Sequence, residues 1–247
     1  MFYFFDYTPS YHSLLLNRAL IWALLIFVIS ACEQEDDLIV PPPEEEPKVL
    51  TDEHEYFLKI SLESELEDNP ERVKKWRDDM RIYVVDTTYT ELMDELDGVM
   101  AEINALSGGI TLQRVSTQDE SNYLIYFGDR RTYTRKYEPA ASPLVEDNYG
   151  VFWIYWDDEY QIYQGSMYVD MERTEETDCQ KHLLREELTQ SLGLMQDSDD
   201  YPTSIFYQQW TCLPRYADID KQLIRWQLSP DIEAGMRRDD LLALWGF

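Results

Sequence analysis

The sequence predicts an α+β domain in which helices cover a mixed β-sheet. First, segments with strand alternation and segments with helical periodicity follow one another in the order strand, long helix, strands, hairpin, helix, loop, helix. Second, 44% apolar and 14% aromatic residues are enough to build a hydrophobic core. Third, no second linker and no internal repeat follows residue 49, so we expect one domain over 49–247.

In the first half of this domain, the expected strands are 56–61, 80–85, 110–115 and 123–127. Residues 71–78, around Trp76, form a charged connection. Residues 88–106 carry apolar side chains at helical spacing and end at Ser107-Gly108-Gly109, which is typical of a helix terminus.

In the second half, 150–156 and 161–171 flank Asp157-Asp158-Glu159 and predict a hairpin. The expected helices are 179–194, 218–228 and 237–244, with an irregular segment at 195–214. The order in which the strands pair does not follow from these patterns.

The amino terminus reads as a targeting segment. Arg18 precedes the apolar run 19–29, which is too short to span a bilayer, and Ser30-Ala31-Cys32 follows. This end resembles the lipobox of bacterial lipoproteins, which implies a signal peptide over 1–31 and membrane attachment through a lipid on Cys32. An ordinary signal peptide and a single anchor helix are the alternatives.

Residues 32–48 are acidic and proline-rich, so we expect an extended tether. The acidic cluster after Cys32 is similar to the surface-export signal of lipoproteins in some Gram-negative lineages. This similarity implies an outer-membrane lipid anchor at the cell surface, with the periplasmic face as the alternative.

The charge balance restricts the partners of the protein. There are 49 acidic and 21 basic side chains, a net charge of −28, which argues against nucleic acid because its phosphates would be repelled. With Cys32 assigned to lipid, Cys179 and Cys212 remain, and an even remainder in an exported protein predicts one disulfide. Two free buried thiols are the alternative.

The segment 182–194 is the most informative helix. Leu184, Leu188 and Leu192 recur every four residues and form a buried stripe. His182, Glu186 and Gln190 recur at the same interval on another face, which indicates a helix that lines a cleft.

This helix resembles that of the zincins, and of the metzincin-like group among them. Residues 186–194 match the frame His-Glu-Leu-x-His-x-Leu-Gly-Leu, which implies that Glu187 occupies the general-base position. Glu186 and Gln190 would then stand where two zinc-binding histidines stand. The segments 202–207 and 218–224 are similar to the turn below such a metal site and to the closing helix. The closer resemblance is to a bacterial zincin-like family of unknown function whose helix reads Glu-Glu-x-x-Gln.

The departures from the zincin frame argue against zinc. A catalytic zinc ion favours imidazole ligands, whereas Gln190 offers a neutral amide and the third histidine position falls on Gln196. Calcium in the run 197–200 is one alternative, and another is an ion shared by His182 and Glu186 with acidic neighbours. Those neighbours are Asp197, Asp199 and Asp200.

Structural roles compete with these chemical ones. His182 is expected to pack near the start of the helix, and Glu187 to be hydrogen-bonded or paired with Arg185 or Arg215. We also hypothesise that a disulfide between Cys179 and Cys212 replaces the ion as the link between this helix and the loop after it.

The hairpin over 149–168 is unusually aromatic. Alternation directs Phe152, Ile154 and Trp156 to one face and Val151, Trp153 and Tyr155 to the other. A sheet covered on both faces is one interpretation; a platform or edge strand for an extended peptide or a glycan is the other.

Three functions follow. The favoured one is a catalytically degenerate, zinc-free peptidase-like module on the cell envelope that binds a peptide or a glycan. The second is a noncanonical metal-dependent hydrolase that uses Glu187 as its general base. The third is a structural component of the envelope.

Overall fold

The computed structural model describes residues 48–63 and 71–247. These residues belong to one compact unit, Pro47–Phe247. The expected signal peptide, Cys32 and the tether up to residue 47 therefore lie outside the described residues. Within the described ranges, no helix combines the length and the apolar character needed to cross a bilayer.

A six-stranded mixed sheet forms the centre of the domain. Its strands are β1 (Lys75–Trp76), β2 (Met80–Val84), β3 (Leu112–Arg114), β4 (Tyr123–Gly128), β5 (Gly150–Trp156) and β6 (Gln161–Asp170). Neighbours along the sheet run in the order β1-β6-β4-β2-β3, all parallel, and β5 pairs with β6 in the antiparallel direction. The expected mixed sheet with helices is therefore confirmed.

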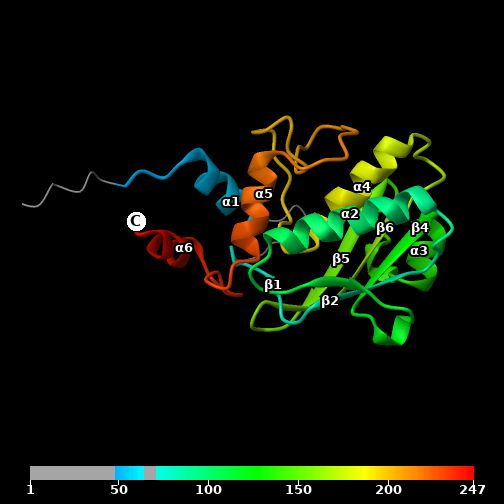
Figure 1. Cartoon of the computed structure of the whole chain (residues 1–247), viewed down its shortest axis with the longest axis horizontal. Coiled ribbons are helices and arrows are strands. Elements are labelled where there is room, and N and C mark those ends of the chain that lie inside the picture. Colours follow the sequence, from blue (N-terminus) through cyan, green and yellow to red (C-terminus); the bar gives the residue numbers. More distant parts are fainter. Residues whose placement is uncertain (1–47, 64–70) are drawn as a thin grey trace, which may run out of the picture. The chain divides into compact units, whose positions relative to one another are not determined.

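Among the described residues, the helices that accompany the sheet are α1 (Asp52–Leu62), α2 (Thr90–Leu106), α3 (Arg130–Lys136), α4 (Thr177–Gln190), α5 (Asp218–Gln227) and α6 (Arg238–Trp245). Helices α2 and α4 pack against each other over one face of the sheet, as Figure 1 shows. Helix α5 packs against α1 and α2 and extends the main core of the domain.

Both faces of the aromatic hairpin are covered. Phe152, Ile154 and Trp156 pack with the main core, on the side of α2 and α4. Val151 and Trp153 belong to a second cluster around Tyr133 of α3. The expected alternation is confirmed, and packing on both sides accounts for the aromatic content of the hairpin.

The strand expected over 56–61 is wrong, because these residues belong to α1. The side chain of Thr51 accepts the backbone N–H of His54, and the imidazole of His54 bonds back to Thr51, so the helix is capped at its start. Phe57 and Ile60, three residues apart, are fully buried. A short apolar run fits both periods, and here tertiary burial selects the helix.

Two further elements were not predicted from the sequence. The charged connection around Trp76 contains the two-residue strand β1, and α3 has the sequence Arg-Arg-Thr-Tyr-Thr-Arg-Lys, which has no apolar periodicity. The other expected strands and helices are confirmed within a few residues at their ends. The regular part of α4 stops before Gly193, which adopts φ +107° and lies against the carbonyl of Lys74, where a Cβ would clash.

Candidate functional site

A cavity of about 290 Å³ lies between β5 and α4. The segment that leads into β5 forms one wall, α4 forms the floor, and the loop after α4 forms the opposite wall. The structure brings together the helix residues that the sequence singled out. His182, Glu186, Glu187 and Gln190 all line the cavity, and Asp197 joins them from the loop.

Strand β5 is the edge of the sheet beside this cavity. It pairs with β6 on one side, and in the described ranges no strand pairs with its other side. The carbonyl of Tyr149 accepts the N–H of Asp170 in β6, so the backbone groups of Gly150 and Phe152 point the other way. The N–H of Phe152 indeed donates to the carboxylate of Glu187 on α4.

Glu187 is buried at the base of the cavity. Its side chain touches Gly150, where an added Cβ would lie 2.5 Å from Oε1. Burial raises the pKa of Glu187 well above its usual value, the negative charge of Asp197 raises it further, and the Phe152 N–H acts in the opposite direction. The expected hydrogen bond is present, whereas Arg185 pairs instead with Glu95 and Glu102 of α2.

Gln190 and Asp197 form a direct pair. The amide nitrogen Nε2 of Gln190 donates to Oδ1 of Asp197 over 2.6 Å. Asp197 therefore stands beside the second histidine-equivalent position, while the neighbouring Gln196 donates to the backbone carbonyl of Asp197. An amide that donates to a carboxylate joins the helix to the loop without an ion.

His182 lies on the same face of α4 as Glu186 and Gln190, at the end nearer the start of the helix, and its ring is held by hydrogen bonding. Its Nδ1 lies 3.0 Å from the carbonyl of Leu213, so Nδ1–H is the donor, and Nε2 lies 3.5 Å from Oε2 of Glu186. Burial lowers the pKa of His182, the Leu213 carbonyl opposes this, and the positive charge of Arg185 adds to the lowering. The packed role expected for His182 is present, and the side chain also faces the cavity.

The donor groups do not converge as a metal centre requires. Asp200 pairs with Lys59 at 2.9 Å, and Asp199 accepts from Gln209 at 3.2 Å, so both are engaged with partners other than His182 and Glu186. In the part of the chain that the structure describes, the one group of three candidate ligands within 4.8 Å is Glu176, Cys179 and Cys212. Its two sulfurs are bonded to each other. The residues present therefore do not fit a zinc ion.

The expected disulfide joins Cys179 to Cys212. Cys179 lies in the first turn of α4, and Cys212 follows the cavity wall formed by residues 207–211. The bridge and the hydrogen bond from His182 to Leu213 together fix this wall to the helix.

The turn at 202–207 is hydrogen-bonded to α5. Asp220 accepts from the hydroxyl of Ser204 and from the backbone N–H groups of Ile205 and Ala217. Burial nonetheless raises the pKa of Asp220 to about 6. The two segments that the sequence compared with the turn and the closing helix of zincins are thus in direct contact.

Sequence reasoning missed Arg173, which shapes the other wall. Its guanidinium pairs with the buried Asp170 at 2.6 Å and donates to the backbone carbonyls of Val145, Glu146 and Asn148. These bonds hold the segment that leads into β5. The motif Asp170-x-x-Arg173 directly after a strand was the available signal.

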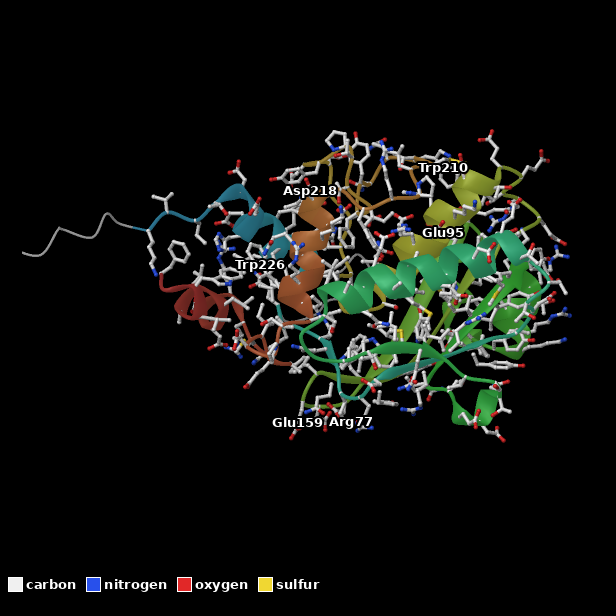
Figure 2. All side chains as sticks on the ribbon, viewed as in Figure 1. Arg77, Glu95, Glu159, Trp210, Asp218 and Trp226 are labelled. Atoms are coloured by element: carbon white, nitrogen blue, oxygen red, sulfur yellow. A yellow bond between two sulfur atoms is a disulfide. The ribbon has the colours of Figure 1, made fainter. Side chains whose placement is uncertain are left out.

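Two aromatic side chains lie at the cavity, Tyr149 from the start of the aromatic hairpin and Trp210, which the sequence patterns did not indicate. The rings of Tyr149 and Trp210 meet edge to face, 5.3 Å apart, and their residues are 38% and 58% exposed. Arg173 lies 4.7 Å from the centre of the Tyr149 ring and holds it in place. Trp210 lies on the loop beside α4 (Figure 2).

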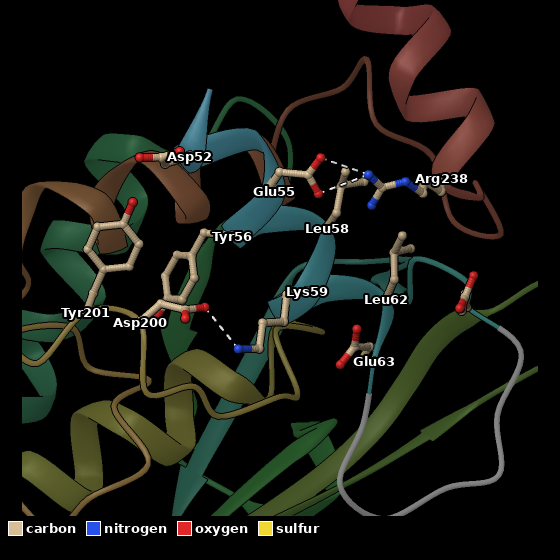
Figure 3. Close-up of a pocket in the computed structure, with 11 residues that line it drawn as sticks. Asp52, Glu55, Tyr56, Leu58, Lys59, Leu62, Glu63, Asp200, Tyr201 and Arg238 are labelled. Carbon is tan, nitrogen blue, oxygen red and sulfur yellow. Dashed lines mark hydrogen bonds and ion pairs between the residues drawn. The ribbon is translucent and has the colours of Figure 1, made fainter. Parts of the chain in front are cut away.

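A larger cavity, of about 650 Å³, lies along α1. Both of its basic side chains are paired: Lys59 pairs with Asp200, and Arg238 makes two contacts of 2.9 Å with Glu55, as Figure 3 shows. Asp52, Glu63 and Glu71 line it as well. The residues of the resemblance lie in the smaller cavity, and no edge strand borders the larger one. We therefore place the candidate site between β5 and α4.

The fold and site define a class of protein: an α+β domain with an antiparallel edge strand beside a helix that carries acidic and amide side chains. Residues 51–244 match a family described as proteins of unknown function, DUF2927. The match spans most of the chain, so the protein belongs to this family. No curated protein matches the chain.

Proposed function

We propose that this domain is a zinc-free, peptidase-like module that binds an extended peptide in the cleft between β5 and α4. The observation that carries the proposal is the position of β5. It is an antiparallel edge strand with its outer backbone groups directed towards the cavity. The N–H of Phe152 is bonded to Glu187, so a peptide added as a further strand would pair with the other outer groups of β5.

The zincin-like assignment of the scaffold belongs to the same proposal. It is supported by the Glu-Glu-x-x-Gln helix at the base of the cavity, by the edge strand above it and by the contact between the 202–207 turn and α5. In zincin-like folds, peptide substrates align along the sheet edge beside the cleft. A peptide is therefore favoured over a glycan, because the edge strand β5 offers backbone groups that a peptide can match as an added strand.

Catalysis by an activated water is not part of the proposed function. Glu187 is directed to the Phe152 N–H, and Gln190 is directed to Asp197, so the side chains that would hold an ion already bond to the protein. The metal-dependent hydrolase with Glu187 as general base remains the alternative, and the structural envelope component is the other.

The location of the domain is a proposal too. The lipobox-like Ser30-Ala31-Cys32 supports a lipid anchor on Cys32, and the acidic residues after it support an outer-membrane, surface-exposed position. The disulfide is consistent with an oxidising compartment. Metabolic labelling with a palmitate analogue, compared between the wild type and Cys32→Ala, tests the anchor; equal labelling would refute it.

Peptide binding is tested with a library of capped hexapeptides, by fluorescence anisotropy on the purified protein. We expect binding without cleavage, and loss of binding when alternate backbone nitrogens of a bound peptide are methylated. Methylation removes donors that an added strand needs and leaves its side chains unchanged.

Elemental analysis of the same sample separates the alternatives. A stoichiometric bound ion together with peptide cleavage that is lost on chelation would establish the hydrolase instead. Failure of every peptide to bind would favour the structural component.

A further inference from the structure

Three side chains of the kinds that ligate metal ions meet where α4 begins. A carboxylate oxygen of Glu176 and the sulfurs of Cys179 and Cys212 all lie within 4.8 Å of one another. While the two sulfurs are bonded to each other they cannot act as thiolate ligands, so the disulfide form of the protein offers no ion site here. The group is separate from the candidate peptide site, because none of its three members lines the cavity between β5 and α4.

Two of the three donor groups come from the start of α4. Glu176 is the residue that precedes the helix, and Cys179 follows three residues later in the first turn. Residues at this spacing lie on the same side of a helix, and the N–H of Cys179 donates to the backbone carbonyl of Glu176. The sulfur of Cys179 consequently lies 3.6 Å from Oε2 of Glu176. The start of the helix itself therefore brings a sulfur and a carboxylate together.

This sulfur–oxygen distance is the one that a shared zinc ion needs. Zinc–sulfur bonds of about 2.3 Å and zinc–oxygen bonds of about 2.0 Å, at a tetrahedral angle, separate the two ligand atoms by about 3.5 Å. The distance of 3.6 Å between Cys179 and Glu176 agrees with that value. On the same geometry the two sulfurs must stand about 3.8 Å apart. Rotation of the cysteine side chains supplies this movement once the bond between the sulfurs is broken.

Cys212 is held beside the helix by its neighbours as well as by the disulfide. The carbonyl of Leu213 accepts from Nδ1 of His182 over 3.0 Å, and the hydroxyl of Thr211 lies 3.3 Å from Nε2 of the same ring. Both residues that flank Cys212 are thus bonded to one imidazole of α4. Since these contacts do not involve the sulfurs, we expect the Cys212 thiol to stay beside the start of the helix when the bridge is opened.

We propose that reduction of the bridge between Cys179 and Cys212 creates a zinc site, with Glu176 as the third protein ligand. A dithiol reductant opens the bridge by thiol–disulfide exchange: each protein sulfur gains one electron and one proton, and the dithiol becomes a disulfide. Zinc then binds the two sulfurs as thiolates and releases their two protons. The exposed carboxylate of Glu176 completes three protein ligands, and the fourth position is open to water. The ion would link α4 to the cavity wall in place of the bridge, and this role does not depend on peptide binding.

The test uses the purified full chain in a Cys32→Ala background, so that Cys179 and Cys212 are its only thiols. A phosphine opens the bridge without adding thiol ligands, and cobalt(II) is then titrated under anaerobic conditions as a spectroscopic probe for zinc. We expect a thiolate-to-cobalt charge-transfer band that saturates at one ion per chain and disappears when equimolar zinc is added. The disulfide form should show no band. Absence of the band from the reduced protein would overturn the proposal.

A matched pair of variants tests the carboxylate ligand. Glu176→Gln should weaken cobalt binding by the reduced protein at least tenfold, because a neutral amide oxygen is the poorer ligand. Asp178→Asn, an exposed acidic residue in the first turn of α4, should leave cobalt binding unchanged. Circular dichroism of each reduced variant confirms that it is folded. Equal effects of the two substitutions, or no effect of either, would overturn the proposed ligand set.

Two further measurements separate a folded site from a pair of free thiols. Unfolding the reduced chain in urea should weaken cobalt binding at least tenfold, because the three ligands are then no longer held together; equal binding would overturn the proposal. Zinc should raise the melting temperature of the reduced protein and leave that of the disulfide form unchanged, since it binds only the reduced folded state. No rise in the reduced protein would overturn the link through the ion. Each of these failures would leave peptide binding intact, because the cavity has its own assay.

Discussion

The disulfide between Cys179 and Cys212 offers the sharpest test of how the site is held together. The bridge closes a loop across a sequence separation of 33, which contains most of α4 and the cavity wall that follows it. Opening it returns conformational freedom to the unfolded chain. On the chain-entropy relation this costs about 4 kcal/mol of folding free energy.

The corresponding change in melting temperature follows from the size of the domain. A unit of about 200 residues has an unfolding entropy of roughly 0.4 kcal/mol/K near its melting temperature. Dividing about 4 kcal/mol by that entropy predicts a fall of about 9 °C. If the bridge serves in place of an ion, a chelator should produce no fall.

Thermal unfolding followed by circular dichroism measures this shift on the purified protein, with and without a phosphine reductant and with and without EDTA. The double variant Cys179→Ala, Cys212→Ala should melt at the temperature of the reduced protein and should not respond to reductant. Thiol alkylation and mass spectrometry verify that the bridge is open. An unchanged melting temperature after verified reduction would refute the reasoning, and so would a fall caused by EDTA alone.

The remaining predictions concern single side chains around the same cleft. Because the pKa of Glu187 is raised in the folded state, its contribution to stability is present below the ordinary glutamate pKa and is lost as pH rises through the folded value. Glu187→Gln should therefore gain stability relative to the wild type as pH rises from about 4 to 8, measured by urea unfolding at each pH; a constant difference would contradict the assignment. Arg173→Met leaves Asp170, 1% exposed, without its partner and should cost about 3–5 kcal/mol in urea unfolding. Arg77→Met, in an exposed pair with Asp78, is its control and should cost under about 1 kcal/mol; equal costs would show that Arg173 is not essential to the wall. Finally, the double variant Glu186→His, Gln190→His should acquire stoichiometric zinc by elemental analysis, with Asp197, which lies 2.6 Å from the Gln190 amide, as the third ligand. Failure of the folded variant to take up zinc would count against the zincin-like geometry.

Much of the fold followed from periodicity. Helix α2 repeats its apolar residues over 17 residues, and the hairpin alternates over most of β5, so each pattern is long enough to identify its element. The run Tyr56-Phe57-Leu58-Lys59-Ile60-Ser61 is too short for that, and only contact with the core selects the helix. Helix α3 lacks an apolar stripe because it buries mainly Tyr133, so its sequence gives no periodic signal.

The helix residues of the candidate site could be found in the sequence for a related reason. His182, Glu186 and Gln190 share one face because they are four residues apart, and an α-helix places such residues in line. Arg173, Tyr149 and Trp210 reach the site from three separate segments, and no spacing in the sequence relates them.

The chemistry of the individual helix positions was therefore determined by the amino-acid sequence: a carboxylate and an amide stand at the positions that the resemblance to zincins assigns to zinc-binding histidines, and two cysteines remain to pair. What only the tertiary structure decided is the environment of those groups. The pairing of β5 with β6 leaves an open edge above α4, and burial beneath that edge directs Glu187 to a backbone N–H and Gln190 to Asp197. The physical reason is that side-chain identity is local, whereas desolvation, hydrogen-bond partners and the sign of the field in a cavity arise from residues that are distant along the chain.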